Sequence, residues 1–186
     1  MLTRNFDSIM AGYLSVGARG TSVTEAEWLG GRPGAVKTQF GLIKGINQYP
    51  LNDDSVFGNA GGNDKFVQLP TSSNQNYAIL LVGSNNAAET YDDFAISIIS
   101  DLTVIGSRYS NITYTADGCV YNTVKTFVNN TENDITVNEV GIFYHFDNTV
   151  DALVYRKKLD KSVTLKAQGG TASFNVVIDI PYANKP

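Results

Sequence analysis

Between residues 71 and 180, apolar and polar side chains alternate along short segments, which is the period of a β-strand with one buried face. The clearest segment is 171–180, where five apolar side chains alternate with mostly polar ones. No proline occurs between residues 71 and 180, as expected of an extensive sheet, because proline lacks the amide donor of a ladder hydrogen bond. The pattern predicts strands at 77–83, 94–99, 101–109, 111–116, 119–129, 135–146, 150–158, 162–167 and 171–180.

Turn sequences separate several of these segments. They are Asp117-Gly118, Asn129-Asn130, Asp147-Asn148 and Gly169-Gly170. Short strands at this spacing are typical of antiparallel β-sandwiches. We therefore predict a mainly β protein whose residues 71–186 form an antiparallel β-sandwich of jelly-roll or Ig-like type.

The N-terminus shows a helical period instead. Phe6, Ile9, Met10 and Tyr13 recur at the spacing of one helix face, which predicts a short helix at 4–15. A helix this short is marginal alone in water, so its apolar stripe docks either on its own domain or on a neighbouring subunit. In the second case these four residues are candidate assembly contacts.

Residues 17–70 are rich in glycine and weakly periodic. Of the 17 glycines in the chain, 11 lie between Gly12 and Gly62. One strand is expected around Lys37 to Ile43, and residues 53–66 are expected to form a long loop. Because long structureless loops are uncommon in compact domains, we predict that residues 1–70 comprise the N-terminal helix and a Gly-rich extended arm that orders against partners.

Composition and charge exclude several functional classes. The chain carries 14 basic and 18 acidic residues, for a net charge of −4, so a basic nucleic-acid-binding surface is not expected. A single Cys and a single His cannot build a Cys-based zinc site or a multi-His centre. No apolar run approaches the roughly 18 residues of a membrane span, and no signal peptide is expected. We expect no cofactor, no metal, no nucleic-acid partner and no membrane partner.

Candidate catalytic groups are few, and the sequence does not predict an enzyme. His145 and Cys119 fall in predicted strands, where structural roles are favoured. The acidic pairs at 53–54 and 92–93 could supply oxygen ligands for calcium, but they lack the alternating spacing of a calcium-binding loop. The chain contains no nucleophile elbow, no phosphate-binding loop and no H-E-x-x-H motif.

One cross-strand ion pair can be predicted from the hairpin at 135–158. If Asp147-Asn148 is a two-residue turn, Phe146 faces Thr149, and Glu139 then lies directly opposite Arg156. An opposite-charge pair in this position contributes roughly 0.2–1 kcal/mol. We interpret Glu139 and Arg156 as a structural pair that fixes the strand register, in preference to a catalytic acid and its partner.

Two blocks of the sequence resemble structural proteins of tailed-bacteriophage virions. Residues 80–94, LLVGSNNAAETYDDF, resemble a block with a hydrophobic-Gly-Ser/Thr start and an Asp-Asp pair near its end. Residues 127–165 resemble a hairpin with the pattern F-x-N … t-V-x-E-h-G-h-h … hhh-R-x-x-h, in which Glu139, Gly141 and Arg156 occupy the marked positions. The opening MLTRNFDSIMAGYL also resembles the short helix with which such proteins begin.

The resemblance implies a non-enzymatic virion protein, made in the cytoplasm of the bacterial host and used as a head-decoration, neck or tail component. It implies a homo-oligomer that contacts other virion proteins of the capsid, portal/neck or tail. The alternative is a carbohydrate- or receptor-binding β-sandwich module of a phage fibre. Exposed aromatic side chains would then stack on sugar rings, and the candidates are Trp28, Tyr49, Tyr77, Tyr91, Tyr109 and Tyr114. A β-sandwich hydrolase would need two carboxylates facing each other across a cleft, and no two acidic residues indicate that geometry.

Overall fold

The computed structural model describes residues 1–14, 23–45, 77–114, 118–146 and 150–181. The elements in chain order are α1 (Arg4–Leu14), α2 (Glu25–Leu29), β1 (Ala35–Lys37), β2 (Ile43–Gly45), β3 (Tyr77–Gly83), β4 (Leu102–Tyr114), β5 (Gly118–Asn129), β6 (Ile135–Phe146), β7 (Val150–Leu165) and β8 (Gly170–Pro181). Neither helix in these ranges has the length and hydropathy needed to cross a membrane.

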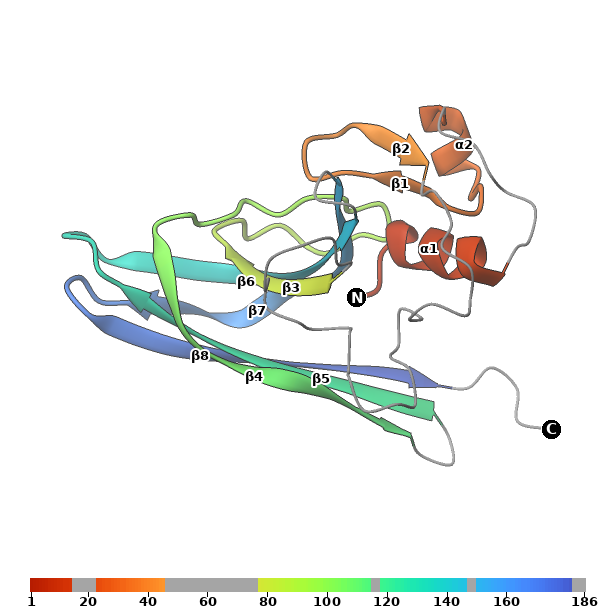
Figure 1. Ribbon diagram of the computed structural model, residues 1–186. Coiled ribbons are helices and arrows are strands. Elements are labelled where there is room, and N and C mark those ends of the chain that lie inside the picture. Colours follow the sequence, from red (N-terminus) through yellow and green to blue (C-terminus); the bar gives the residue numbers. More distant parts are fainter. Residues whose placement is uncertain (15–22, 46–76, 115–117, 147–149, 182–186) are drawn as a thin grey trace.

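The long strands form two antiparallel sheets, β3-β6-β7 and β4-β5-β8, so the prediction of a mainly β, antiparallel fold is confirmed. Figure 1 shows them as two layers, with α1, α2 and the β1-β2 hairpin at one end of the β3-β6-β7 layer. Side chains from both sheets meet in one buried core, and burial of this apolar surface is the main stabilising contribution. The core includes Leu80, Val82, Val140, Ile142, Tyr144, Tyr121, Phe127, Phe174, Val176 and Ile178.

The strand β8 has the alternation that its sequence predicts. Phe174, Val176 and Ile178 are buried, whereas the residues between them are exposed. β8 pairs with β5 without interruption from Gly118↔Pro181 to Asn129↔Gly170. A period of two therefore assigns this strand's core-facing side chains directly.

Five of the predicted strand segments need correction. The segments 101–109 and 111–116 form one strand, β4, whose register shifts between Val104 and Gly106 and again between Arg108 and Asn111. The segments 150–158 and 162–167 likewise form one strand, β7. The predicted strand at 94–99 is wrong, because this segment is irregular apart from one bridge between Gly83 and Ile98.

The helix α1 agrees with the prediction of a helix at 4–15. Phe6 and Ile9 belong to the same core cluster as the two sheets, and Ile9 is 2% exposed. The residues before α1 run along β7, where the Thr3 amide donates to the Val154 carbonyl at 3.1 Å and the Thr3 hydroxyl donates to the Leu153 carbonyl at 2.6 Å. The helix therefore docks on its own chain.

Residues 23–45 are folded rather than part of an extended arm with a single strand. Thr24 caps α2, since its hydroxyl accepts from the Glu27 amide at 3.3 Å while the Glu27 carboxylate accepts from the Thr24 amide at 2.8 Å. This capping box is visible in the sequence as Thr-x-x-Glu and marks a helix that the periodicity missed. The expected strand at Lys37–Ile43 is instead the turn joining β1 to β2. The rest of the predicted arm, the loop at 53–66 and the domain boundary at 70–71 lie outside the described residues.

Candidate functional site

The outer face of the β3-β6-β7 sheet is covered by an irregular segment, residues 84–99, which we call the covering loop. The loop is joined to β3 and to itself by backbone hydrogen bonds, from the Ile99 amide to the Val82 carbonyl at 3.0 Å and from the Ser84 amide to the Ser97 carbonyl at 2.9 Å. Its Ile96 is buried against Phe143 and Leu153 in a second, smaller apolar cluster. The cluster explains how a segment with little regular structure stays on the sheet.

Beside this cluster, Arg156 Nε donates to Glu139 Oε2 at 2.7 Å. The predicted register is nevertheless wrong, because Arg156 pairs with Gly141 and Glu139 pairs with Lys158. The hairpin closes with Phe146 opposite Val150, and a further shift between Ile142 and Phe143 moves the two strands relative to each other. Glu139 and Arg156 are thus diagonal neighbours on one face, a separation that long side chains can span.

Both members of this pair are almost inaccessible to solvent. Glu139 is 0% exposed and Arg156 is 3% exposed. A buried charge is tolerated only when its remaining hydrogen-bonding groups are satisfied. The covering loop supplies most of the partners that do so.

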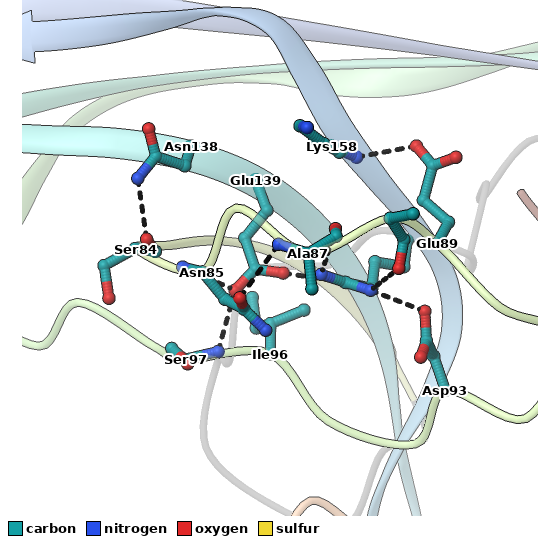
Figure 2. Close-up of polar contacts among 12 residues, drawn as sticks. Ser84, Asn85, Ala87, Glu89, Asp93, Ile96, Ser97, Asn138, Glu139 and Lys158 are labelled. Carbon is teal, nitrogen blue, oxygen red and sulfur yellow. Dashed lines mark hydrogen bonds and ion pairs between the residues drawn. The ribbon is translucent and has the colours of Figure 1, made fainter.

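The guanidinium of Arg156 is bound on its far side by the covering loop. Its Nη1 donates to Asp93 Oδ2 at 2.7 Å and to the Ala88 carbonyl at 3.1 Å, and its Nη2 donates to the Ala87 carbonyl at 3.1 Å. Figure 2 labels Ala87 and Asp93 of the loop together with Glu139 of the sheet. One arginine therefore connects β6 and β7 with the covering loop.

The second oxygen of Glu139 binds two backbone amides of the covering loop. Glu139 Oε1 accepts from the Ser97 amide at 2.8 Å and from the Asn85 amide at 3.2 Å (Figure 2). These amides stand near opposite ends of the loop, so one carboxylate fixes both ends. Hydrogen bonds to a charged acceptor are stronger than neutral ones.

Two glycines leave the space that this hydrogen-bond network needs. A Cβ at Gly83 would lie 2.5 Å from Glu139 Oε1 and 2.9 Å from the Ser97 carbonyl oxygen. A Cβ at Gly141 would lie 2.9 Å from a methyl carbon of Leu153 and 3.2 Å from Ile96. Glycine at these positions permits the close approach of the carboxylate and the loop to the sheet.

The electrostatics agree with an ionised network. Burial acts to raise the pKa of Asp93, but hydrogen bonds from Thr90 and Arg156 outweigh it, and the pKa lies below its ordinary value. For Arg156, burial acts to lower the pKa, whereas the hydrogen bonds to Asp93 and Glu139 raise it above its ordinary value. The guanidinium therefore stays charged while it donates to Glu139, Asp93 and the carbonyls of Ala87 and Ala88.

This arrangement, which we call the joint, fixes the covering loop to the β3-β6-β7 sheet. The oxygens of Glu139 are committed to donors of the chain, and those of Asp93 are bound by Thr90 and Arg156. The neighbouring Asp92 pairs with Arg4 at 2.7 Å. In the part of the chain that the structure describes, no three His, Cys, Asp or Glu side chains gather as metal ligands.

Of the remaining predicted site residues, the structure describes the side chains of Phe6 and Ile9. Phe6 and Ile9 lie in the core, and the side chains of Met10 and Tyr13 lie outside the description, as do those of His145 and Cys119 and the acidic pair at 53–54. Asp93 is the member of the joint whose role the sequence did not reveal. It lies in the 80–94 block, and its pairing with Arg156 depends on a contact across 63 residues.

Of the aromatic residues proposed to stack on sugar rings, the structure describes the side chains of Trp28 and Tyr91. Trp28 is 2% exposed and donates its ring N–H to Asn5 Oδ1 at 2.9 Å, so it cannot form an exposed platform. Tyr91 is 41% exposed, but the Arg4 guanidinium carbon lies 4.8 Å from the centre of its ring. The side chains of Tyr49, Tyr77, Tyr109 and Tyr114 lie outside the described residues.

An exposed apolar tip on the β1-β2 hairpin was not expected from the sequence. Phe40 is 86% exposed and Leu42 is 58% exposed. The turn is well formed, since the Thr38 amide donates to the Leu42 carbonyl at 2.8 Å, and the Gln39 side chain donates to the Ile96 carbonyl of the covering loop at 2.7 Å. Large apolar side chains held in this way are candidate contacts for another protein.

Comparison of this chain with known proteins finds no matching protein family, no matching curated protein and no matching solved structure.

Proposed function

We propose that this protein is a non-enzymatic structural component of a bacteriophage virion. One observation carries the proposal. The two sequence blocks that resemble virion proteins, 80–94 and 127–165, are joined in space by the contacts of Arg156 with Glu139, Ala87 and Asp93. The marked positions of the resemblance thus serve to hold a loop on a sheet, which is the role expected in a building block.

We further propose that the two sheets form a β-sandwich of the jelly-roll or Ig-like type. The shared core between β3-β6-β7 and β4-β5-β8 supports this assignment. A sandwich with a firmly attached covering loop is rigid. A rigid subunit keeps its shape when it forms many contacts with other subunits in a particle.

In this proposal the protein is a homo-oligomer at the head, neck or tail, in contact with other virion proteins. The exposed Phe40 and Leu42 on a well-formed hairpin are suited to such contacts, because aromatic anchors contribute strongly to protein interfaces.

The test uses cells whose genome encodes the chain. Particles released by these cells are purified by density-gradient centrifugation, and their proteins are quantified by mass spectrometry. We expect the chain in the particle band at a fixed ratio to the other particle proteins, before and after a high-salt wash. A chain that stays in the soluble fraction, or cells that release no particles, would overturn the proposal.

A further inference from the structure

Among the described residues, no strand pairs with the outer edge of β8 in the β4-β5-β8 sheet. β8 lies at the end of the strand order and pairs with β5 over its whole length without a register shift. Among the described residues, the backbone groups of Thr171 to Asp179 form hydrogen bonds only with β5. In an edge strand, alternate amide and carbonyl groups point away from the neighbouring strand, so β8 presents an uninterrupted row of donors and acceptors.

The sequence and register of β8 lack several features that usually prevent an edge strand from pairing with another chain. Natural edge strands are protected by lysines, prolines, bulges or a short length. From Gly170 to Ile180, β8 has no lysine, arginine or proline, and its one charged residue is Asp179 near the end. Its 12 residues make it as long as β5, so the edge is long, uninterrupted and nearly neutral.

The opposite edge of the same sheet is different. The register of β4 against β5 shifts twice, at Val104/Gly106 and at Arg108/Asn111, and the strand carries Arg108. Each irregularity bends a strand and interrupts its row of hydrogen-bonding groups. The uninterrupted β8 therefore finds no matching partner in β4 of another copy, which argues against a head-to-tail ring built from these two edges.

The backbone amide and carbonyl groups on this edge can be satisfied by another extended strand. The β8 strand of a second copy is such a strand. We propose that β8 pairs antiparallel with β8 of a second copy, which joins the two β4-β5-β8 sheets into one continuous sheet about a two-fold axis. In such a pair, facing residues lie on the same side of the sheet. Self-pairing puts the same surface on both copies, the defining feature of a two-fold interface.

We propose a register centred on Val176, with which the side chains are compatible. Val176 then faces itself, and Phe174 faces Ile178 of the second copy, so apolar residues stay together on the core side. On the other side, Asp179 faces Ser173 of the second copy, and the two Asp179 carboxylates lie at opposite ends of the pair. No like charges are opposed, which removes the usual penalty against self-pairing.

This inference deepens the proposed function, because it names the contact of the proposed homo-oligomer. Its tests use the purified full-length chain alone. If β8 does not pair, the particle experiment still tests the proposed function. If the protein is absent from particles, the pairing experiment still tests the β8 contact.

The first test is light scattering on the size-fractionated protein over a concentration series, with Val177→Lys and Ile105→Lys as matched variants. Both positions hold exposed β-branched residues on edge strands of one sheet, Val177 on β8 at 51% and Ile105 on β4 at 57%. We expect a dimer whose dissociation constant is about tenfold weaker in Val177→Lys, since the two lysines would be diagonal neighbours, and unchanged in Ile105→Lys. A monomer at every concentration, a larger ring, or an equal response to both variants would overturn the proposal.

The second test fixes the register and does not depend on the lysine variant. Ser173→Cys and Asp179→Cys are prepared as separate proteins and treated with a short thiol cross-linker, alone and mixed. The register places position 173 opposite position 179 of the second copy and far from position 173 of that copy. We expect a covalent dimer chiefly in the mixture, with the wild-type chain and its native Cys119 as the background control. Equal cross-linking by each protein alone, or none in the mixture, would rule out this register.

Discussion

Arg156 donates to Glu139 at 2.7 Å across a diagonal of the β6-β7 ladder, while the residue directly opposite Arg156 is Gly141. The absence of a side chain at Gly141 leaves the space over the sheet to Ile96 and Leu153. The diagonal arrangement also leaves the outer side of the guanidinium free to bind the covering loop. The ion pair is therefore the base of a three-part joint with Asp93.

Removing the carboxylate of Glu139 is expected to destabilise the fold strongly. Glu139→Ala would leave Arg156 without its partner on the sheet and would orphan the amides of Asn85 and Ser97. Breaking a buried ion pair in this way costs about 3–5 kcal/mol. The measurement is the free energy of unfolding in a urea titration.

The matched control for Glu139→Ala is Lys166→Ala, which removes the exposed ion pair between Lys166 and Asp134. We expect no measurable change in stability, because exposed pairs are screened by solvent. Equal unfolding midpoints for wild type and Glu139→Ala would show that the joint does not stabilise the fold.

Adding a methyl group at Gly83 is expected to push the carboxylate of Glu139 away from the covering loop. The new Cβ of Gly83→Ala would lie 2.5 Å from Glu139 Oε1, and the backbone oxygen of Ser97 closes the other side at 2.9 Å. Overpacking of this kind costs about 1–3 kcal/mol. Gly106→Ala is the control, since its nearest neighbour would lie at an ordinary 3.7 Å.

Hydrogen exchange of the covering loop distinguishes the two glycine variants. We expect faster exchange of the Asn85 and Ser97 amides in Gly83→Ala and unchanged exchange in Gly106→Ala. The same exchange rates in both variants would argue that the loop adapts without cost.

The contribution of Asp93 to stability is expected to disappear in acid. Its pKa in the folded protein lies below the ordinary value of 3.8, because the hydrogen bonds from Thr90 and Arg156 outweigh the effect of burial. A carboxyl group with a lowered folded pKa stabilises the protein above its unfolded pKa, and this stabilisation is lost as the pH falls through the folded pKa. The difference in unfolding free energy between wild type and Asp93→Asn should thus be constant near neutral pH and shrink below about pH 4.

Urea titrations of wild type and Asp93→Asn at several pH values measure this difference. Asp92→Asn is the adjacent control, because Asp92 is 55% exposed and binds Arg4 instead. A gap that stays constant down to the lowest pH at which both proteins fold would contradict the expected role of Asp93.

The docking of α1 on its own chain predicts that Ile9 stabilises the isolated protein. Ile9→Ala removes a side chain that is 2% exposed and belongs to the main core, at a cost of about 2–5 kcal/mol. Ile105→Ala, at an exposed position, should change little. If Ile9→Ala leaves thermal melting unchanged but weakens oligomerisation, the helix acts as an assembly contact instead.

Several features of the fold could be predicted because their cause is local. The period of two in 171–180 identifies both the strand β8 and its buried face, since successive side chains point to opposite sides of a strand. The helical spacing of Phe6 and Ile9 likewise identifies α1 and the stripe that it buries. The capping box of Thr24 and Glu27 was equally readable, because a cap acts within one helical turn.

The candidate site was only half predictable. The opposite charges of Glu139 and Arg156 suggested a pair, but the register shift that makes it diagonal arises where β6 and β7 adjust to each other and to the turn between them. Asp93 joins the pair because the covering loop folds back over the sheet. Such contacts depend on which surfaces remain open once the strands have assembled, so local sequence carries little information about them.

The sequence by itself thus determined the antiparallel β character, the helix α1 and the buried face of β8, since backbone geometry imposes these periods residue by residue. Tertiary structure alone decided that residues 94–99, apolar enough for a strand, form part of the covering loop, with Ile96 buried beneath it. It also decided that Glu139 reaches Arg156 diagonally and that Asp93 completes the joint. The physical reason is that a strand or an ion pair needs a free partner in the right place, and the packing of distant segments determines where that partner lies.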